Sequence, residues 1–143
     1  MSIAYFDASA FVKLVVDEDG SDLAAALWDS CDIVVSSVLS YPEVHAALAA
    51  AARSLRIGAR EHKVAERAWE RYWAATRVVA FSESVMRRAG AVCRDHALRG
   101  AYGVHLASAL VLKDDPTTDV IMVAWDQRLA VAALQLGFRI APA

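Results

Sequence analysis

The chain alternates short apolar runs with longer segments of helical spacing. Four runs of β-branched or aromatic residues, bounded by acidic or small polar residues, have the pattern of buried strands, and a fifth run is weaker. They are residues 3–6, 33–36, 77–81 and 120–125, with 138–140 as the fifth. Strands that alternate with helices predict a mostly parallel sheet covered by helices on both faces.

Seven segments between these runs place apolar residues at intervals of three and four, as amphipathic helices do. They are residues 9–16, 21–30, 40–55, 60–76, 83–97, 102–113 and 127–136. No repeat, low-complexity tract or linker interrupts them, so we expect one domain over residues 1–143. The predicted fold class is α/β, with a short sheet of four or five strands sandwiched between helices.

Composition indicates how the helices of this domain pack and in which compartment the protein is expected. The chain is 57% hydrophobic with a mean hydropathy of +0.33, which favours closely packed helices and a self-association surface. No apolar run is long enough to span a membrane, and Asp7 and Lys13 interrupt the only candidate signal peptide. We therefore expect a cytoplasmic protein without a membrane partner. Cys31 and Cys93 lack the spacing of a metal site or a disulfide framework, so we expect two reduced thiols.

Charge is distributed unevenly along the chain. Residues 53–99 contain eleven Lys or Arg and five Asp or Glu, a net +6, although the whole chain carries −2. The overall charge argues against nucleic-acid binding by bulk positive charge. The basic residues of segment 60–76 are either the solvated face of a helix or a surface that faces phosphates, and both interpretations stay open.

Two acidic residues follow predicted strands. In open parallel sheets, binding sites form where strands end and the chain turns into helices, so Asp7 and Asp126 are both displayed at such an edge. Each can also simply cap the helix that follows it. Glu43 is a third candidate, because its helix starts near the same edge. The Ser40 to Glu43 spacing also matches a helix capping box, so this structural role stays open.

Three carboxylates that converge without a cation would repel one another and raise at least one pKa. Oxygen ligands from Asp and Glu suit Mg²⁺ or Mn²⁺, whereas no histidine has the spacing of a zinc site. Among the histidines, His105 has the sequence context of a buried core residue. A carboxylate-bound Mg²⁺ is well suited to activate water against a phosphodiester, which predicts phosphoryl chemistry. An aspartyl phosphatase would need a second Asp at position 9, which is Ser9.

The sequence resembles PIN-domain proteins, specifically the VapC-type toxins of bacterial toxin–antitoxin pairs. Four stretches carry this resemblance: YFDASAFVKL with Asp7 and Ser9, SSVLSYPEVHAAL with Glu43, LRGAYGVHLASAL, and VAWDQRLAVAALQLGF with Asp126. They occur in the family's order over residues 4–138. The resemblance implies a PIN-like α/β/α domain with Mg²⁺-dependent (or Mn²⁺-dependent) endoribonuclease activity on an RNA such as tRNA or ribosomal RNA. It also implies a homodimer and inhibition by a VapB-type antitoxin.

By this resemblance, Asp7, Glu43 and Asp126 would hold the metal, and Ser9 would support them. One position departs from the family pattern, in which an acid follows the tyrosine of the third stretch; here that residue is Gly103. The absence of this acid lowers the formal charge of the site from −4 to −3 and predicts weaker metal binding. Two hypotheses follow: an attenuated or inactivated ribonuclease, or a non-catalytic binding module that keeps the dimer and antitoxin surfaces.

Overall fold

Five parallel strands form the centre of the molecule. The computed structural model describes residues 1–143, and the strand order across the sheet is β3-β2-β1-β4-β5. The strands are β1 (Ser2–Phe6), β2 (Ile33–Ser37), β3 (Arg77–Val79), β4 (Asp119–Val123) and β5 (Arg139–Ala141). Because β2 and β4 flank β1 on opposite sides, the chain direction across the sheet reverses at β1, which is where such sheets form binding sites.

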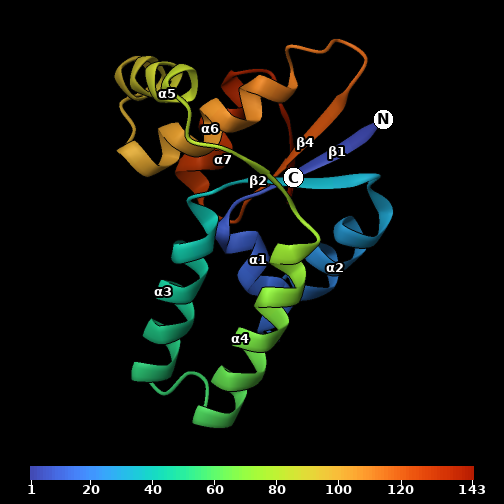
Figure 1. Cartoon of the computed structure of the whole chain (residues 1–143), viewed down its shortest axis with the longest axis vertical. Helices are drawn as coiled ribbons and strands as arrows, with labels where there is room; N and C mark the ends of the chain where they lie inside the picture. Colours follow the sequence, from blue (N-terminus) through green and yellow to red (C-terminus); the bar gives the residue numbers. More distant parts are fainter.

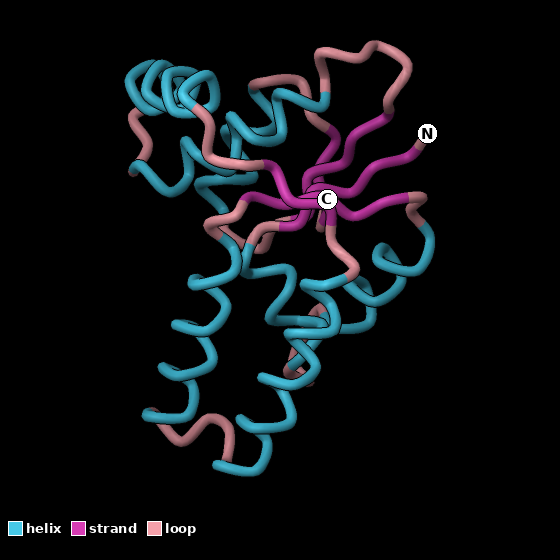
Figure 2. The backbone as a smooth tube through the Cα atoms, in the orientation of Figure 1, coloured by secondary structure: helices cyan, strands magenta, loops and turns pink.

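Seven helices cover the two faces of this sheet (Figures 1 and 2). One face carries α1 (Ala8–Val15), α2 (Ser21–Ser30), α3 (Ser40–Arg53) and α4 (Ala59–Ala74), and the other carries α5 (Glu83–His96), α6 (Gly100–Leu112) and α7 (Gln127–Gln135). The predicted α/β fold with helices on both faces is confirmed. Helices α3 and α4 form a hairpin that extends beyond the sheet (Figure 1).

The alternation of side chains along β1 explains why both faces are buried. Ile3 and Tyr5 pack in the core beneath α5, α6 and α7, whereas Ala4 and Phe6 pack in the core beneath α1, α3 and α4. Phe11 and Trp69 close the second core, with ring centroids 4.8 Å apart. The aromatic side chain of Trp69 therefore belongs to the core.

Several predicted boundaries shift by a few residues. The strand predicted at 77–81 ends at Val79, and the helix predicted from residue 102 begins at Gly100. The strand predicted over 120–125 ends at Val123, so two residues separate it from Asp126. The fifth strand is present over Arg139–Ala141. None of the helices is both long enough and apolar enough to cross a membrane.

Candidate active site

Asp7 lies directly after β1 and begins helix α1. Its Oδ1 accepts hydrogen bonds from the Ala10 amide at 3.0 Å and from the Ser9 hydroxyl at 2.6 Å. The residue is only 5% exposed. Burial raises the pKa of the Asp7 carboxyl, and nearby Glu43 raises this pKa further, while His105, Ser9 and Ala10 lower it. Asp7 is thus both a helix cap and a buried acid at the edge of the sheet.

Glu43 does not form the capping box that its spacing with Ser40 allowed. Helix α3 has no side-chain cap, and the Ser40 hydroxyl instead lies 2.7 Å from the Ser36 hydroxyl in the core. The Glu43 Oε1 atom lies 2.6 Å from Nε2 of His105 on α6. The capping interpretation of Glu43 is therefore wrong, because its carboxylate turns toward the opposite layer of the protein.

His105 is buried, as predicted, and it also connects the core to the site. Its Nδ1 atom lies 2.8 Å from the Tyr5 hydroxyl, while its Nε2 atom holds Glu43. Burial raises the pKa of Tyr5, and Asp7 and Glu43 raise it further, so the phenol stays neutral. Both ring nitrogens of His105 are thus engaged, and the imidazole fixes the position of Glu43.

Asp126 begins helix α7 and is held from two sides. Its Oδ1 accepts from the amides of Arg128 at 2.9 Å and Leu129 at 3.3 Å. Its Oδ2 accepts from the Tyr102 hydroxyl of α6 at 2.6 Å. This hydrogen bond to Asp126, together with burial, raises the pKa of Tyr102.

The structure brings these acidic residues to one edge of the sheet, but it does not merge them into one ligand cluster. Asp7 and Glu43 interact electrostatically, and Ser9 links Asp7 to the loop before α7, because the Trp125 amide donates to the Ser9 hydroxyl at 2.9 Å. No three His, Cys, Asp or Glu side chains lie close enough together to hold a metal ion. Asp126 therefore stands beside the Asp7–Glu43 pair rather than within it.

Gly103 does not face this site. A Cβ at this position would lie 2.2 Å from Sγ of Cys93 and 2.9 Å from the carbonyl oxygen of Ala89, both on α5. Helix α6 packs tightly against α5 here, which is what requires a glycine. The expectation that the missing acid weakens metal binding stays a prediction. The residue of this turn that reaches Asp126 is Tyr102.

The chemistry of the donor atoms fits a hard divalent cation at Asp7 and Glu43. The hydrogen bonds of Asp7 all fall on Oδ1 and that of Glu43 falls on Oε1, so each side chain keeps one oxygen without a protein donor. Two acids that repel each other, one of them buried, are stabilised by a positive charge. Oxygen donors are the ligands that Mg²⁺ and Mn²⁺ prefer.

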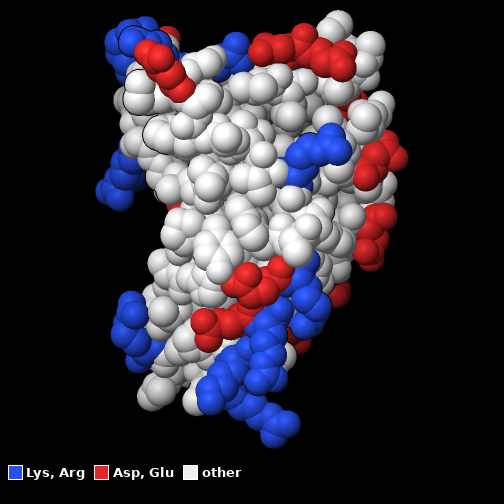
Figure 3. Space-filling model, in the orientation of Figure 1, with Lys and Arg blue, Asp and Glu red and all other residues white.

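Basic side chains gather in separate groups on the α3–α4 hairpin, over α4 and the far end of the hairpin (Figure 3). We call them together the basic row; its members are Arg53, Arg56, Arg60, Lys63, Arg67 and Arg71, all of them exposed. None of the six forms an ion pair with a carboxylate. The acidic residues of α4 behave differently, because Glu66 and Glu70 face His45 on α3. The basic side chains of the hairpin are thus unpaired and exposed, whereas Glu66 and Glu70 lie near a histidine.

Two residues of the site, Tyr102 and His105, were missed as site residues in the sequence. Their spacing of three on a helix places them on one face, next to the turn that follows β4. This shared helix face was the sequence feature that could have identified both as site residues.

Comparison with known proteins gives a consistent result. The PIN domain family matches residues 4–133 of this chain. Ribonucleases VapC45 and VapC49 of Mycobacterium tuberculosis are each 54% identical over 143 residues, which is all of this chain and 97% of each relative.

Solved structures share the fold at low sequence identity. VapC20 of M. tuberculosis, described as a sarcin–ricin loop cleaving toxin, aligns with a TM-score of 0.61 at 20% identity and covers 94% of this chain and 95% of its own. A toxin–antitoxin complex from Klebsiella pneumoniae aligns with a TM-score of 0.62 at 15% identity, covering 86% of each chain. The chain therefore belongs to the PIN-domain family, and its curated relatives are VapC-type ribonucleases.

Proposed function

We propose that this chain is a Mg²⁺-dependent endoribonuclease toxin that cleaves phosphodiester bonds of RNA. One observation carries the metal site: a buried carboxylate, Asp7, lies beside a second carboxylate, Glu43, and burial raises the pKa of Asp7 in the absence of a cation. A divalent cation at this pair would supply an activated water and would neutralise charge on the scissile phosphate. The close relatives named as ribonucleases support the same chemistry.

The residues around the pair have distinct roles in this proposal. Ser9 and the Ala10 amide fix Asp7 Oδ1, which leaves Oδ2 for the cation. His105 fixes Glu43 Oε1 in the same way and leaves Oε2. Asp126 contributes a third carboxylate, directly or through water. Asp7 and Glu43 thus each have one oxygen oriented by the protein and one oxygen available, whereas both oxygens of Asp126 already accept hydrogen bonds from the protein.

RNA cleavage with and without Mg²⁺ tests this proposal. Wild-type protein is expected to cleave a structured RNA only with Mg²⁺, and Asp7→Asn is expected to abolish the activity. Asp17→Asn, which changes an exposed acid on the neighbouring loop, serves as the matched control and retains activity. Cleavage that persists in chelator, or in Asp7→Asn, would contradict the proposal.

The basic row favours an RNA substrate of some length. Six exposed cations without carboxylate partners attract a phosphate backbone, and such contacts set affinity rather than sequence preference. VapC20, which shares this fold, is described as acting on the sarcin–ricin loop. We accordingly propose tRNA or ribosomal RNA as the substrate class. The non-catalytic alternative is based on the absence of an acid at Gly103, and RNA cleavage by the Mg²⁺-loaded protein would exclude it.

We also propose that a VapB-type antitoxin binds next to the site. A cavity of about 370 Å³ lies between α1, the end of α3 and the start of α4, and it extends to Ser9 and Trp125. Its lining combines apolar residues such as Val12 and Leu48 with charged ones such as Arg56, as a peptide groove requires. The toxin–antitoxin complex from K. pneumoniae has the same fold. Competition by antitoxin against RNA cleavage, lost in a Val12→Arg variant that still cleaves, tests this groove, because Val12 lines it and is only partly buried.

We also propose that the protein forms a homodimer. Val38 and Phe81 follow the neighbouring strands β2 and β3, and their side chains are 44% and 53% exposed. Exposed apolar side chains of this kind mark self-association surfaces. Light scattering is expected to give twice the chain mass for the wild type and the chain mass for Phe81→Lys. A monomeric wild type would exclude the dimer.

A further inference from the structure

An open hollow lies between the end of α5, the loop that precedes α6, and α7. Its volume is about 350 Å³, which is within the range of small-ligand sites. We call it the α5–α7 hollow; its lining includes His96, Leu98, Gln127, Arg128, Val131 and Gln135. None of the residues that line it is acidic. The hollow therefore offers apolar, amide and cationic groups without a negative charge.

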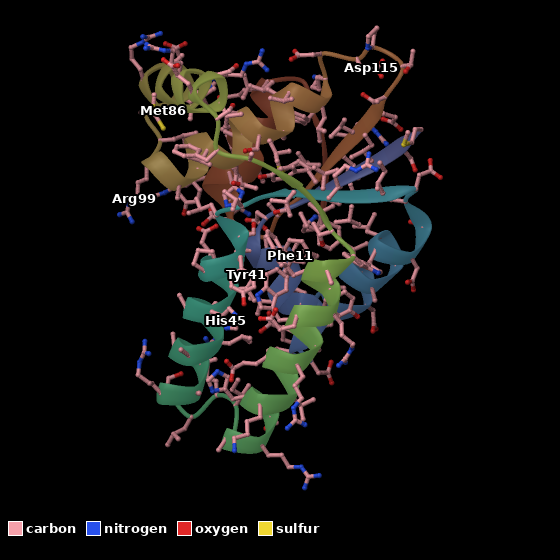
Figure 4. The ribbon with its side chains drawn as sticks, viewed as in Figure 1. Phe11, Tyr41, His45, Met86, Arg99 and Asp115 are labelled. Atoms are coloured by element: carbon pink, nitrogen blue, oxygen red, sulfur yellow. The ribbon has the colours of Figure 1, made fainter.

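Two arginines without carboxylate partners stand at this hollow. Arg128 lines it, and Arg99 follows Leu98 and extends into solvent from the loop before α6 (Figure 4). Both side chains are exposed, and neither forms an ion pair. Both also lie close enough to Tyr102 to oppose the rise in its pKa that Asp126 and burial cause. The two guanidinium groups thus serve one region of the surface.

The acids next to the hollow in the sequence already have partners. Asp95 pairs with Arg94 at 3.1 Å. Asp126 accepts hydrogen bonds from the Tyr102 hydroxyl and from the first amides of α7. The positive charge of the two arginines is therefore available to an external anion, and guanidinium groups match the geometry of phosphate oxygens.

The other groups of the hollow suit a nucleobase. Leu98 and Val131 supply apolar surface, and Val131 is 52% exposed. Nδ1 of His96 donates to Oε1 of Gln135 at 3.1 Å, so the amide nitrogen of Gln135 keeps both of its hydrogens for a ligand. The Gln127 amide adds a further donor and acceptor. Unstacked RNA bases are recognised by stacking, also on guanidinium planes, and by hydrogen bonds to their edges.

The hollow adjoins the edge of the sheet that carries the acidic pair. The Ser9 hydroxyl contacts both Asp7 and the Trp125 amide, and Trp125 is two residues before Gln127 of the hollow. The basic row lies on α3 and α4 on one face of the sheet, whereas the hollow lies in the layer on the other face (Figure 1). An RNA strand that crosses the edge between the layers therefore meets positive charge on both sides.

We propose that the α5–α7 hollow binds a nucleotide of the RNA substrate that flanks the cleaved bond, with its phosphate held by Arg99 and Arg128. The apolar lining contacts the base, and the amides of Gln127 and Gln135 bind the base edge. This inference rests on the proposed ribonuclease function, because it takes RNA as the partner. The hollow thereby adds a base contact to the phosphate contacts of the basic row, and base contacts are what give sequence preference.

Fluorescence anisotropy with a single-stranded oligoribonucleotide of mixed sequence tests this inference. The measurement uses an Asp7→Asn background without Mg²⁺, so it is independent of cleavage. Arg99→Ala with Arg128→Ala is expected to lower the slope of log affinity against log salt by about 0.7 per lost phosphate contact. Arg87→Ala with Arg139→Ala removes two cations that are paired with carboxylates, and should leave the slope unchanged.

A matched pair of variants on α7 tests the hollow itself. Val131→Glu places a carboxylate in the hollow and is expected to weaken RNA binding roughly tenfold, because it repels the phosphate. Leu134→Glu adds the same charge to the same helix outside the hollow, where Leu134 is 59% exposed. This control is expected to bind RNA as the parent protein does.

An unchanged salt slope for Arg99→Ala with Arg128→Ala would overturn the inference. A lower slope combined with normal RNA binding by Val131→Glu would also overturn it, because phosphates would then bind at the rim and no base would enter the hollow. Failure of the wild type to cleave RNA with Mg²⁺ would instead refute the proposed ribonuclease function, while the RNA contact of the hollow, measured without metal, would stand.

Discussion

The His105 imidazole lies 2.6 Å from the Glu43 carboxylate and joins two layers of the protein across the edge of the sheet. Glu43 comes from α3 on one face, and His105 comes from α6 on the other. The second nitrogen of the ring reaches the Tyr5 hydroxyl of the central strand at 2.8 Å. The position of one site acid is therefore determined by a buried polar chain that extends into the core.

Replacing the buried polar residues Tyr5 and His105 together is expected to weaken metal binding while the protein stays stable. His105→Ala alone removes one hydrogen-bond partner of the buried Tyr5 hydroxyl and creates a cavity beside it, at a cost of about 2–4 kcal/mol in the free energy of unfolding. His105→Leu combined with Tyr5→Phe keeps the core apolar and filled, and we expect a loss of less than about 1.5 kcal/mol. Urea denaturation measures both values.

The same double variant is expected to bind Mn²⁺ roughly tenfold more weakly than the wild type, because Glu43 loses the group that orients it. His96→Ala is the control, since His96 contacts Gln135 on the surface. If the double variant is stable and binds Mn²⁺ normally, then His105 is only a core residue.

Gly103→Ala is expected to destabilise the protein by about 1–3 kcal/mol, because an added Cβ meets Cys93 and the Ala89 carbonyl on α5. Gly90→Ala is the matched control: Gly90 lies within α5, a Cβ there meets nothing within 4 Å, and the change is expected to stabilise by up to about 1 kcal/mol. Thermal unfolding distinguishes the two. A neutral Gly103→Ala would show that α5 and α6 are not closely packed at this point.

The sequence predicted the fold well because its strands are buried on both faces and its helices have clear apolar spacing. It also predicted that Asp7 and Asp126 follow strands, since that depends only on local order. The role of Glu43 was ambiguous, because the same spacing with Ser40 fits a cap. Only the packing of Ser40 against Ser36 removes that option.

Gly103 and Tyr102 show where sequence reasoning fails. A shift of one residue on a helix turns a side chain by about 100°, so the tyrosine at position 102 and an acid at position 103 would point to different neighbours. Which of them faces the site depends on how α6 is rotated against α5. That rotation is set by the close approach at Gly103 and is visible only in three dimensions.

Asp7 gives the metal-free protein a pH-dependent stability. Its pKa is raised above the ordinary value of 3.8 by burial, so the folded protein keeps this proton to a higher pH than the unfolded chain. The associated stability is fully present below 3.8 and is lost as the pH rises through the folded-state pKa. Asp7→Asn is therefore expected to raise the Tm at neutral pH by a few degrees and to flatten its dependence on pH.

Mg²⁺ is expected to raise the Tm of the wild type relative to that of Asp7→Asn. The cation stabilises the folded wild type in proportion to its binding and leaves Asp7→Asn unchanged. Scanning calorimetry from pH 4 to 8, with and without Mg²⁺, measures both effects, and Asp17→Asn controls for the loss of a negative charge. If Asp7→Asn lowers the Tm at neutral pH without metal, then the Asp7 carboxylate is stabilised by the protein and needs no cation.

RNA binding by the basic row is expected to depend on salt. Lys63→Ala with Arg67→Ala removes two exposed cations, so the slope of log affinity against log salt should fall by about 0.7 per lost phosphate contact on single-stranded RNA. Arg87→Ala with Arg139→Ala removes the same charge from residues paired with Glu83 and Asp119, and should leave the slope unchanged. Fluorescence anisotropy with an Asp7→Asn background, which prevents cleavage, measures these slopes. Equal slopes for the two pairs would mean that α4 only carries a solvated face and that RNA binds elsewhere.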